Sequence, residues 1–264
     1  MPLDVHKISV QLTQAPLAVS PAELRREEAL FLVGAELAPQ PTLETIFDSD
    51  CQKPVELFVF NFQRSEGLIQ ASSLLELIKK NLRGFVLARL DFAPAPELLE
   101  FAYAHGVDLV SVKVDSPLDD AAASADKWFP ALEQARHIFP RWAVGADLDL
   151  STLSPSQVIE AMKILAAGQI VPLVALDVNS QTRDTNRLQD IFTHLSRCWK
   201  GSGMTLRPWG PLIERTTPLV LPSPRTLVGN LLIRAQNAHL RTGSDLRRLL
   251  RVREVEKSFD SAGL

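Results

Sequence analysis

Four apolar runs of this chain each end in two polar side chains spaced two residues apart, and this repeated pattern restricts the fold more than any other feature. Side chains on a strand alternate between its two faces, so both members of a pair point to the same face. If the strands are parallel, all the pairs meet at one end of the sheet. The pairs are Arg89 with Asp91, Lys113 with Asp115, Asp147 with Asp149, and Asp177 with Asn179.

The order of the predicted elements favours a parallel sheet. Helical patterns of roughly 10–15 residues separate the strand-like runs, and such alternation implies right-handed crossovers between parallel strands. We therefore predict an α/β protein, a partial or closed (β/α) TIM-type barrel with a C-terminal helical extension. The predicted strands begin near Leu57, Phe85, Leu109, Val144 and Val171, with weaker candidates near Ile8 and Thr205. A closed barrel needs eight strands, so this count favours an open or partial one.

The chain divides into three predicted segments. Residues 1–56 are expected to form an N-terminal helical and loop segment, in which a serine and a proline precede a helix over residues 22–31. Residues 57–205 are expected to form the barrel core. Residues 206–264 read as a proline-rich exit loop and basic C-terminal helices that pack on the barrel. One domain is expected, because 46% hydrophobic residues in 264 can supply one substantial core.

The charge balance limits the classes of partner. The chain has 28 Lys and Arg against 31 Asp and Glu, a formal net charge of -3, so it has no overall attraction to nucleic acid or anionic lipid. No stretch reaches the roughly 18 apolar residues that a membrane span needs, and the first residues lack the apolar run of a signal peptide. We expect a soluble protein that binds neither membranes nor nucleic acid.

Metal and cofactor motifs are missing from the sequence. Cys51 and Cys198 are too few for a disulfide framework, which suits a cytoplasmic protein. The five histidines show no ligand spacing, and there is no GxGxxG, P-loop or GxSxG motif. We predict no metal site and no cofactor. Trp209 is expected to pack in the interior, with a lid over the pocket as the alternative.

The strand-end side chains are the candidate site. Asp91, Lys113 and Asp147 are the predicted catalytic residues. In one interpretation the set surrounds a small polar or anionic molecule. In the other, these acids only start loops and helices and neutralise their basic neighbours; a Mg²⁺ site built from the acids is a third alternative. The predicted ligand-binding residues are Asn61, Arg89, Asp115, Asp149, Asp177 and Asn179.

Lys113 has two interpretations of its own. A lysine on a barrel strand forms a Schiff base when burial lowers its pKa, and Asp91 or Asp147 would then serve as the acid or base of a lyase or aldolase. Flanking carboxylates such as Asp115 would instead raise the pKa of Lys113 and favour a salt bridge. The salt bridge is the preferred interpretation.

Roughly residues 85–235 resemble the second half of a radical SAM partial barrel, closest to the biotin synthase-like branch. The segments that carry the resemblance are PELLEFAYAHGVDLVSVKVD, ADKWFPALEQARHIFP and AVGADLDLSTLSPSQVIEAMKILAAGQIVPLVALDV, followed by TTPLVLPSP over residues 216–224. That family holds a [4Fe–4S] cluster through a CxxxCxxC loop after its first strand. Here residues 57–67 contain no cysteine, and the family's GGE turn is missing. The resemblance therefore implies a radical SAM-like pseudoenzyme without cluster chemistry.

The last forty residues form a basic amphipathic pattern that predicts helix. Asp245, Glu254 and Glu256 interrupt its basic residues, and no aromatic side chains interleave for stacking on bases. A solvated face or a subunit contact is the preferred interpretation. A protein partner, or a second copy of the chain, is therefore expected to bind through the C-terminal helix.

Overall fold

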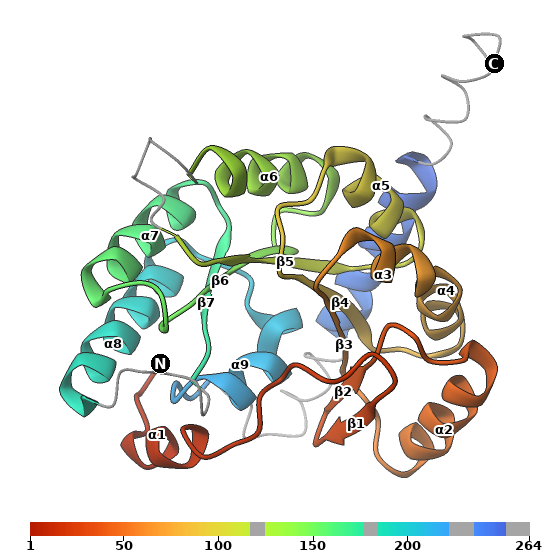
Figure 1. The fold of residues 1–264 in the computed structure, drawn as a ribbon, viewed down its shortest axis with the longest axis horizontal. Helices are drawn as coiled ribbons and strands as arrows, with labels where there is room; N and C mark the ends of the chain where they lie inside the picture. Colours follow the sequence, from red (N-terminus) through yellow and green to blue (C-terminus); the bar gives the residue numbers. More distant parts are fainter. Residues whose placement is uncertain (117–124, 177–183, 222–234, 252–264) are drawn as a thin grey trace, which may run out of the picture.

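A computed structural model of the chain describes residues 1–116, 125–176, 184–221 and 235–251, which form an α/β fold around one seven-stranded sheet (Figure 1). The strands lie side by side in chain order. β1 pairs with β2 in antiparallel fashion, and every later neighbour is parallel. The predicted α/β architecture is thus confirmed. The strands are β1 (Leu24–Glu27), β2 (Leu30–Val33), β3 (Leu57–Phe62), β4 (Phe85–Leu90), β5 (Leu109–Val114), β6 (Val144–Leu148) and β7 (Val171–Val174).

Helices α2, α4, α5, α6, α7 and α8 lie in an arc around the outside of the sheet, in chain order (Figure 1). The start of α7 matches its sequence signals, because Ser154 and Gln157 form a reciprocal capping box. The helices are α1 (Val5–Gln11), α2 (Pro39–Gln52), α3 (Ser65–Gln70), α4 (Ser72–Asn81), α5 (Pro96–Ala104), α6 (Ala125–Ile138), α7 (Pro155–Ala167), α8 (Thr185–Gly201), the 3₁₀ turn η1 (Arg207–Trp209) and α9 (Gly210–Thr216). Residues 235–251 are also helical.

The middle strands are buried on both faces except at one position each. In β3, β4 and β5 only the fifth residue is half-buried, and these residues are Asn61, Arg89 and Lys113. In β6 the corresponding residue is the fourth, Asp147. Continuous burial is typical of parallel strands covered by helices. Each exception therefore marks a place where the inner face of the sheet opens.

Helix α9 joins the two edges of the sheet. The backbone N–H of Leu176, just after β7, donates to the carbonyl of Thr216 at 2.8 Å. Arg215 of the same helix forms an ion pair with Glu27 of β1. Within the described residues β7 has no ladder with β1, so side chains and one backbone bond make this connection.

Trp209 packs against the face of β6 that also carries Asp147, two residues beyond Gly145. Its ring is fully buried, and its Nε1 donates to the carbonyl of Trp142 at 2.8 Å. A Cβ added to Gly145 of β6 would lie 2.8 Å from this ring, so the close approach requires glycine. Interior packing of Trp209 is confirmed, and the alternative of a lid is wrong.

The predicted helix over residues 22–31 is wrong, because β1 and β2 form a hairpin there. Charges spaced two apart pair on one side of a strand: Arg25 bonds Glu23 at 3.3 Å and Glu27 at 3.0 Å. Glu28 makes the turn with a φ of 54°, which a helix does not allow. Two strands of the sheet therefore come from the segment that was expected to be helical and loop.

The two weaker strand candidates are also wrong. Ile8 lies in α1, which starts at Asp4, whose carboxylate accepts a hydrogen bond from the backbone N–H of His6. Thr205 leads into η1, where Pro208 stands within the first turn, so no strand forms in that place.

The C-terminal helix, residues 235–251, packs against the amino ends of β4 and β5. Arg248 is buried, and its guanidinium donates to the carbonyl of Val107 at 3.0 Å and pairs with Asp108 at 3.0 Å. Arg241 stacks over the ring of Phe85, 5.5 Å from its centroid. A wholly solvated or intermolecular basic face is therefore wrong for these two arginines, because they hold the helix on the fold.

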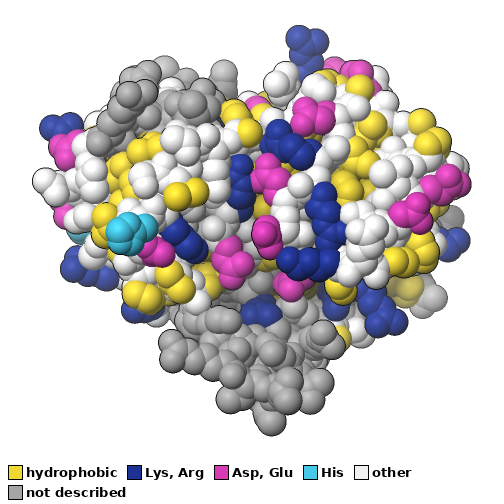
Figure 2. Space-filling model, turned by 90° about the horizontal axis from the view of Figure 1, so that it is seen from below, with side chains coloured by type: hydrophobic (Ala, Val, Ile, Leu, Met, Phe, Trp, Pro, Cys, Tyr) yellow, Lys and Arg dark blue, Asp and Glu magenta, His cyan; other side chains and the backbone are white. Residues whose placement is uncertain are grey.

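The charges on the face seen in Figure 2 are mixed. Lys and Arg side chains alternate with Asp and Glu across its middle, and the described residues form no broad patch of one sign there. Phosphate backbones are bound by patches of positive charge.

Of the helices in the described ranges, none combines the length and the apolar character that crossing a bilayer requires.

Candidate functional site

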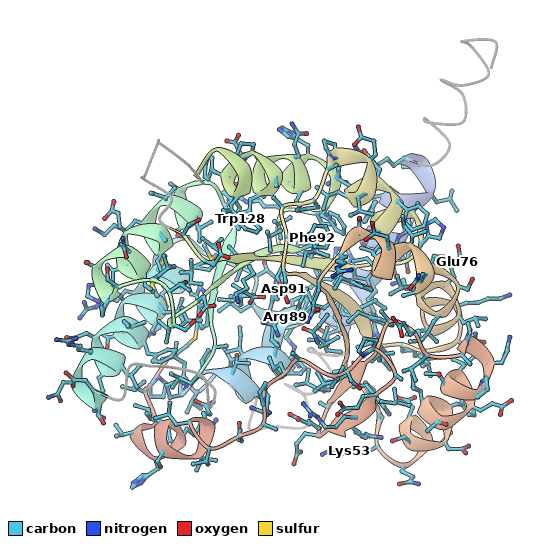
Figure 3. All side chains as sticks on the ribbon, viewed as in Figure 1. Lys53, Glu76, Arg89, Asp91, Phe92 and Trp128 are labelled. Atoms are coloured by element: carbon cyan, nitrogen blue, oxygen red, sulfur yellow. The ribbon has the colours of Figure 1, made fainter. Side chains whose placement is uncertain are left out.

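The half-buried strand positions open into one cavity of about 320 Å³ at the carboxyl ends of the parallel strands. Figure 3 shows Arg89 and Asp91 near the middle of the molecule, inside the arc of helices, whereas Lys53 and Glu76 lie on its outer side. The register explains this convergence, because Asn61 is paired with Arg89, and Lys113 with Asp147. The predicted site residues that line the cavity are Asn61, Arg89, Asp91, Lys113, Asp147 and Asp149.

Arg89 and Asp147 form a bonded network across the floor of the cavity. Nε of Arg89 lies 3.0 Å from Oδ2 of Asp147, which also accepts a hydrogen bond from Oγ of Ser111 at 2.8 Å. Nη1 of Arg89 donates to Oδ1 of Asn61 at 3.3 Å. Only 14% of the Asp147 side chain is exposed. A carboxylate held by two donors in this way neutralises Arg89 and keeps it in position.

Lys113 and Asp149 form the second pair, with Nζ 2.9 Å from Oδ2. The other carboxylate oxygen of Asp149 accepts the backbone N–H of Ser151 at 2.8 Å and its hydroxyl at 2.6 Å. Burial alone would raise the pKa of Asp149, but the hydrogen bonds from Ser151 and Lys113 outweigh it, so the pKa is lowered.

The same pair determines the protonation of Lys113. The hydrogen bond that Lys113 donates to Asp149 raises the pKa of Lys113, and this effect outweighs the opposing effect of partial burial. A Schiff-base lysine needs the opposite shift. The predicted salt bridge is therefore present, but with Asp149 rather than with the suggested Asp115.

Asp91 differs from the other acids of the cavity. Its backbone N–H continues the ladder by donating to the carbonyl of Phe62 at 2.9 Å, which fixes the residue beyond the end of β4. Its carboxylate is exposed to the cavity, and within the described part of the chain no group donates a hydrogen bond to it. Partial desolvation raises its pKa, while the positive charges of Arg89 and Lys113 act in the opposite direction.

Three predicted site residues are not placed in the cavity. Asp115 is exposed and does not line it, although it follows β5 as directly as Asp91 follows β4. Its assignment as a ligand-binding residue stays a prediction, and its charge contributes to the raised pKa of Lys113. Asp177 and Asn179 lie outside the described residues.

The structure adds residues that the sequence patterns did not identify. Arg215 reaches the cavity from α9, and its Nη2 donates to the carbonyl of Ala15 at 2.7 Å. Residues 15–18 form part of the wall. Ser111 could have been found, because it stands two residues before Lys113 on the same face of β5. No comparable signal exists for Arg215, which comes from a helix outside the strand and helix repeat.

The acids do not group as a metal centre would require. Across residues 1–116, 125–176, 184–221 and 235–251, no group of three or more His, Cys, Asp or Glu side chains is arranged to hold a metal ion. The nearest cationic groups are instead lysine and arginine, which bond the carboxylates directly. Among the described lining residues, Asp91 is thus an open carboxylate beside the Arg89–Asp147 and Lys113–Asp149 ion pairs.

No protein-family model matches the chain, and no curated protein or solved structure matches it either. The resemblance to radical SAM barrels therefore depends on the sequence segments quoted above. The functional argument depends on the geometry of the cavity, since a fold alone does not determine a function.

Proposed function

We propose that this chain is an incomplete (β/α) barrel of the TIM type, radical SAM-like in design, that binds a small polar molecule without iron–sulfur chemistry. Several features support the barrel form: parallel strands in chain order, helices along the outer side, and α9 between the first and last strands. Barrels of this type bind their ligands at the carboxyl ends of the strands. The cavity lies at that end.

One observation carries the proposal: six polar side chains from four neighbouring strands line a single cavity. Sites for small molecules have volumes of about 300–1,000 Å³, so about 320 Å³ suits a small metabolite rather than a macromolecule. Fixed ion pairs hold the side chains in place before any ligand binds, which reduces the entropy lost on binding.

A pseudoenzyme without a cluster is the second part of the proposal. Cys51 is exposed, and Cys198 is half-buried with its thiol 3.3 Å from the carbonyl of Met162. Neither lines the cavity. We expect purified protein to be colourless and free of iron, and a stoichiometric cluster after anaerobic reconstitution would overturn this part. Two free thiols also fit the proposed cytoplasmic location.

A cavity-filling variant tests the binding proposal. Ala175 lines the cavity just after β7, so Ala175→Phe would occupy the space while leaving every charged side chain in place. Ala104→Phe is the matched control, since Ala104 is exposed on the outer helix α5. Native mass spectrometry of the isolated proteins, followed by thermal-shift screening with small polar metabolites, measures binding.

We expect the wild-type protein and Ala104→Phe to bind the same compounds and Ala175→Phe to bind none of them. If every compound that stabilises the wild-type protein also stabilises Ala175→Phe to the same extent, the cavity is not the binding site. The lyase alternative stays a prediction that the Lys113 and Asp149 pair does not favour. Borohydride trapping of a substrate imine at Lys113 would support it.

A further inference from the structure

Each cation that the described residues contribute to the cavity lining is paired with a carboxylate of the protein. Arg89 lies 3.0 Å from Asp147, and Lys113 lies 2.9 Å from Asp149. Arg215, the third cation of the lining, pairs with Glu27. These three ion pairs contribute no net charge at neutral pH.

Asp91 is the acidic residue of the lining that takes part in none of these ion pairs. It lines the same cavity, and in the described part of the chain it has neither a cation within ion-pair distance nor a hydrogen-bond donor. When Glu27 is counted with its partner Arg215, the described residues leave one formal negative charge at the cavity, on Asp91. An anionic ligand would be repelled by this charge, and the cations that could attract it are already offset by Asp147, Asp149 and Glu27. Complementary charge is what gives a site its specificity.

The remaining polar groups of the cavity suit the rest of a polar amine. The Lys113 side chain is 40% exposed, and an ammonium has three hydrogens, of which the described structure directs one to Asp149. A ligand hydroxyl or carbonyl oxygen can accept another. The hydroxyl of Ser151 also lies at the cavity, where it already donates to Asp149 and can still accept.

We infer that the ligand is a small polar molecule with a protonated amine, and that Asp91 is the residue that selects it. This inference rests on the proposed binding function and specifies the chemical class of the ligand. An ammonium donating to a carboxylate makes a hydrogen bond about twice as strong as a neutral pair does. The ammonium of the ligand would thus supply the positive charge that no described side chain places within ion-pair distance of Asp91.

Three probes of similar size test the inference: serinol, which carries an ammonium, glycerol, which is neutral, and glycerate, which is an anion. Their affinities are measured by ligand-detected NMR titration at about pH 7 with wild-type protein, Asp91→Asn and Asp115→Asn. We expect serinol to bind the wild-type protein about 10-fold more tightly than glycerol, since one charge-assisted hydrogen bond accounts for that ratio. Asp91→Asn should lose this preference.

The control variant Asp115→Asn makes the same chemical change at an exposed acid outside the cavity, and it should keep the preference. The inference is overturned if glycerate binds as tightly as serinol, if Asp91→Asn still prefers serinol, or if serinol does not bind at all. None of these results bears on whether the cavity binds polar molecules, which the comparison of Ala175→Phe with Ala104→Phe decides separately.

Discussion

Asp108 and Asp91 lie at opposite ends of the same pair of strands and are bonded in opposite ways. Asp108, just before β5, is fully buried, and its carboxylate accepts from Nζ of Lys79 at 2.8 Å, from Arg248 at 3.0 Å and from the backbone N–H of Val86 at 3.1 Å. Asp91, just after β4, is exposed and has no donor within the described chain. An acid whose bonding capacity is filled stabilises the fold, whereas an acid left open at a cavity is available to a ligand.

The bonded acid also explains how the C-terminal helix is held. Asp245 of that helix accepts from Lys79 at 3.0 Å and from Arg248 at 2.7 Å. Lys79 and Arg248 are therefore both bonded to the same two acids, Asp108 and Asp245. The hydroxyl of Tyr103 adds a hydrogen bond to the carbonyl of Ser244 at 3.0 Å. The amino ends of the strands are thus closed by a network, while the carboxyl ends stay open.

The largest expected effect follows from removing the buried acid. Asp108→Ala leaves Arg248 and Lys79 without their main partner and takes the acceptor from the N–H of Val86. Breaking a buried ion pair on one side destabilises a protein by about 3–5 kcal/mol. We expect that loss in urea unfolding at neutral pH. Asp115→Ala, at an exposed acid, is the control, and equal stability of the two variants would show that Asp108 has no special structural role.

A smaller loss is expected for the bonded acid at the open end. Asp147→Ala removes a partner of Arg89 and of Ser111. Arg89 would keep its bond to Asn61 and would gain access to water from the cavity, so its charge would not be stranded. We expect about 1–3 kcal/mol, the range for an unsatisfied polar group. If Asp147→Ala destabilises the chain more than Asp108→Ala does in the same urea measurement, the acid at the amino ends of the strands is not the more important one for stability.

The sequence predicted the strands of this site well because their signals are local. Each apolar run from Leu57 onward became a strand, and the two-residue spacing correctly grouped Arg89 with Asp91 and Asp147 with Asp149 at one cavity. The alternation of side chains needs no knowledge of other parts of the chain. The same spacing did not place Asp115 in the cavity, although Asp115 follows β5 as directly as Asp91 follows β4.

What the sequence did not predict depends on contacts between distant segments. Arg215 reaches the cavity from α9. Lys113 pairs with Asp149 rather than with Asp115 because the register of β5 and β6 brings the Lys113 ammonium close to the Asp149 carboxylate. The hairpin over residues 24–33 was missed because its charged residues fit a helix equally well. Only the neighbouring strand β3 decides between the two structures.

Tyr103→Phe tests how much a single hydrogen bond contributes to holding the C-terminal helix. The variant loses the bond from the tyrosine hydroxyl to the carbonyl of Ser244 but keeps the packing of the ring against Phe139. One such bond contributes about 0.5–1.5 kcal/mol. Hydrogen exchange should show faster opening of residues 235–251 with little change in the strands. Uniform acceleration over the whole sheet would mean that the helix and the sheet unfold as one unit.

The smallest expected effect, at Asp91, has the opposite sign to the others. Desolvation raises the pKa of the folded-state carboxyl, so between the ordinary and the raised pKa the folded chain holds more protons than the unfolded chain does. Stability therefore falls as the pH rises through that window, and above it the ionised Asp91 makes the folded state less stable than a neutral residue would.

Asp91→Asn should accordingly raise the melting temperature slightly at pH 7, and this gain should disappear below the ordinary aspartate pKa of about 4, where the acid is protonated in both states. Thermal unfolding of the wild-type protein and the variant at both pH values measures it. A destabilised variant at pH 7 would reveal a bonding partner for Asp91 within the protein and would remove the reason to assign this acid to a ligand. A more stable variant that also loses its preference for amines would show that the open charge is kept for binding, at the expense of stability.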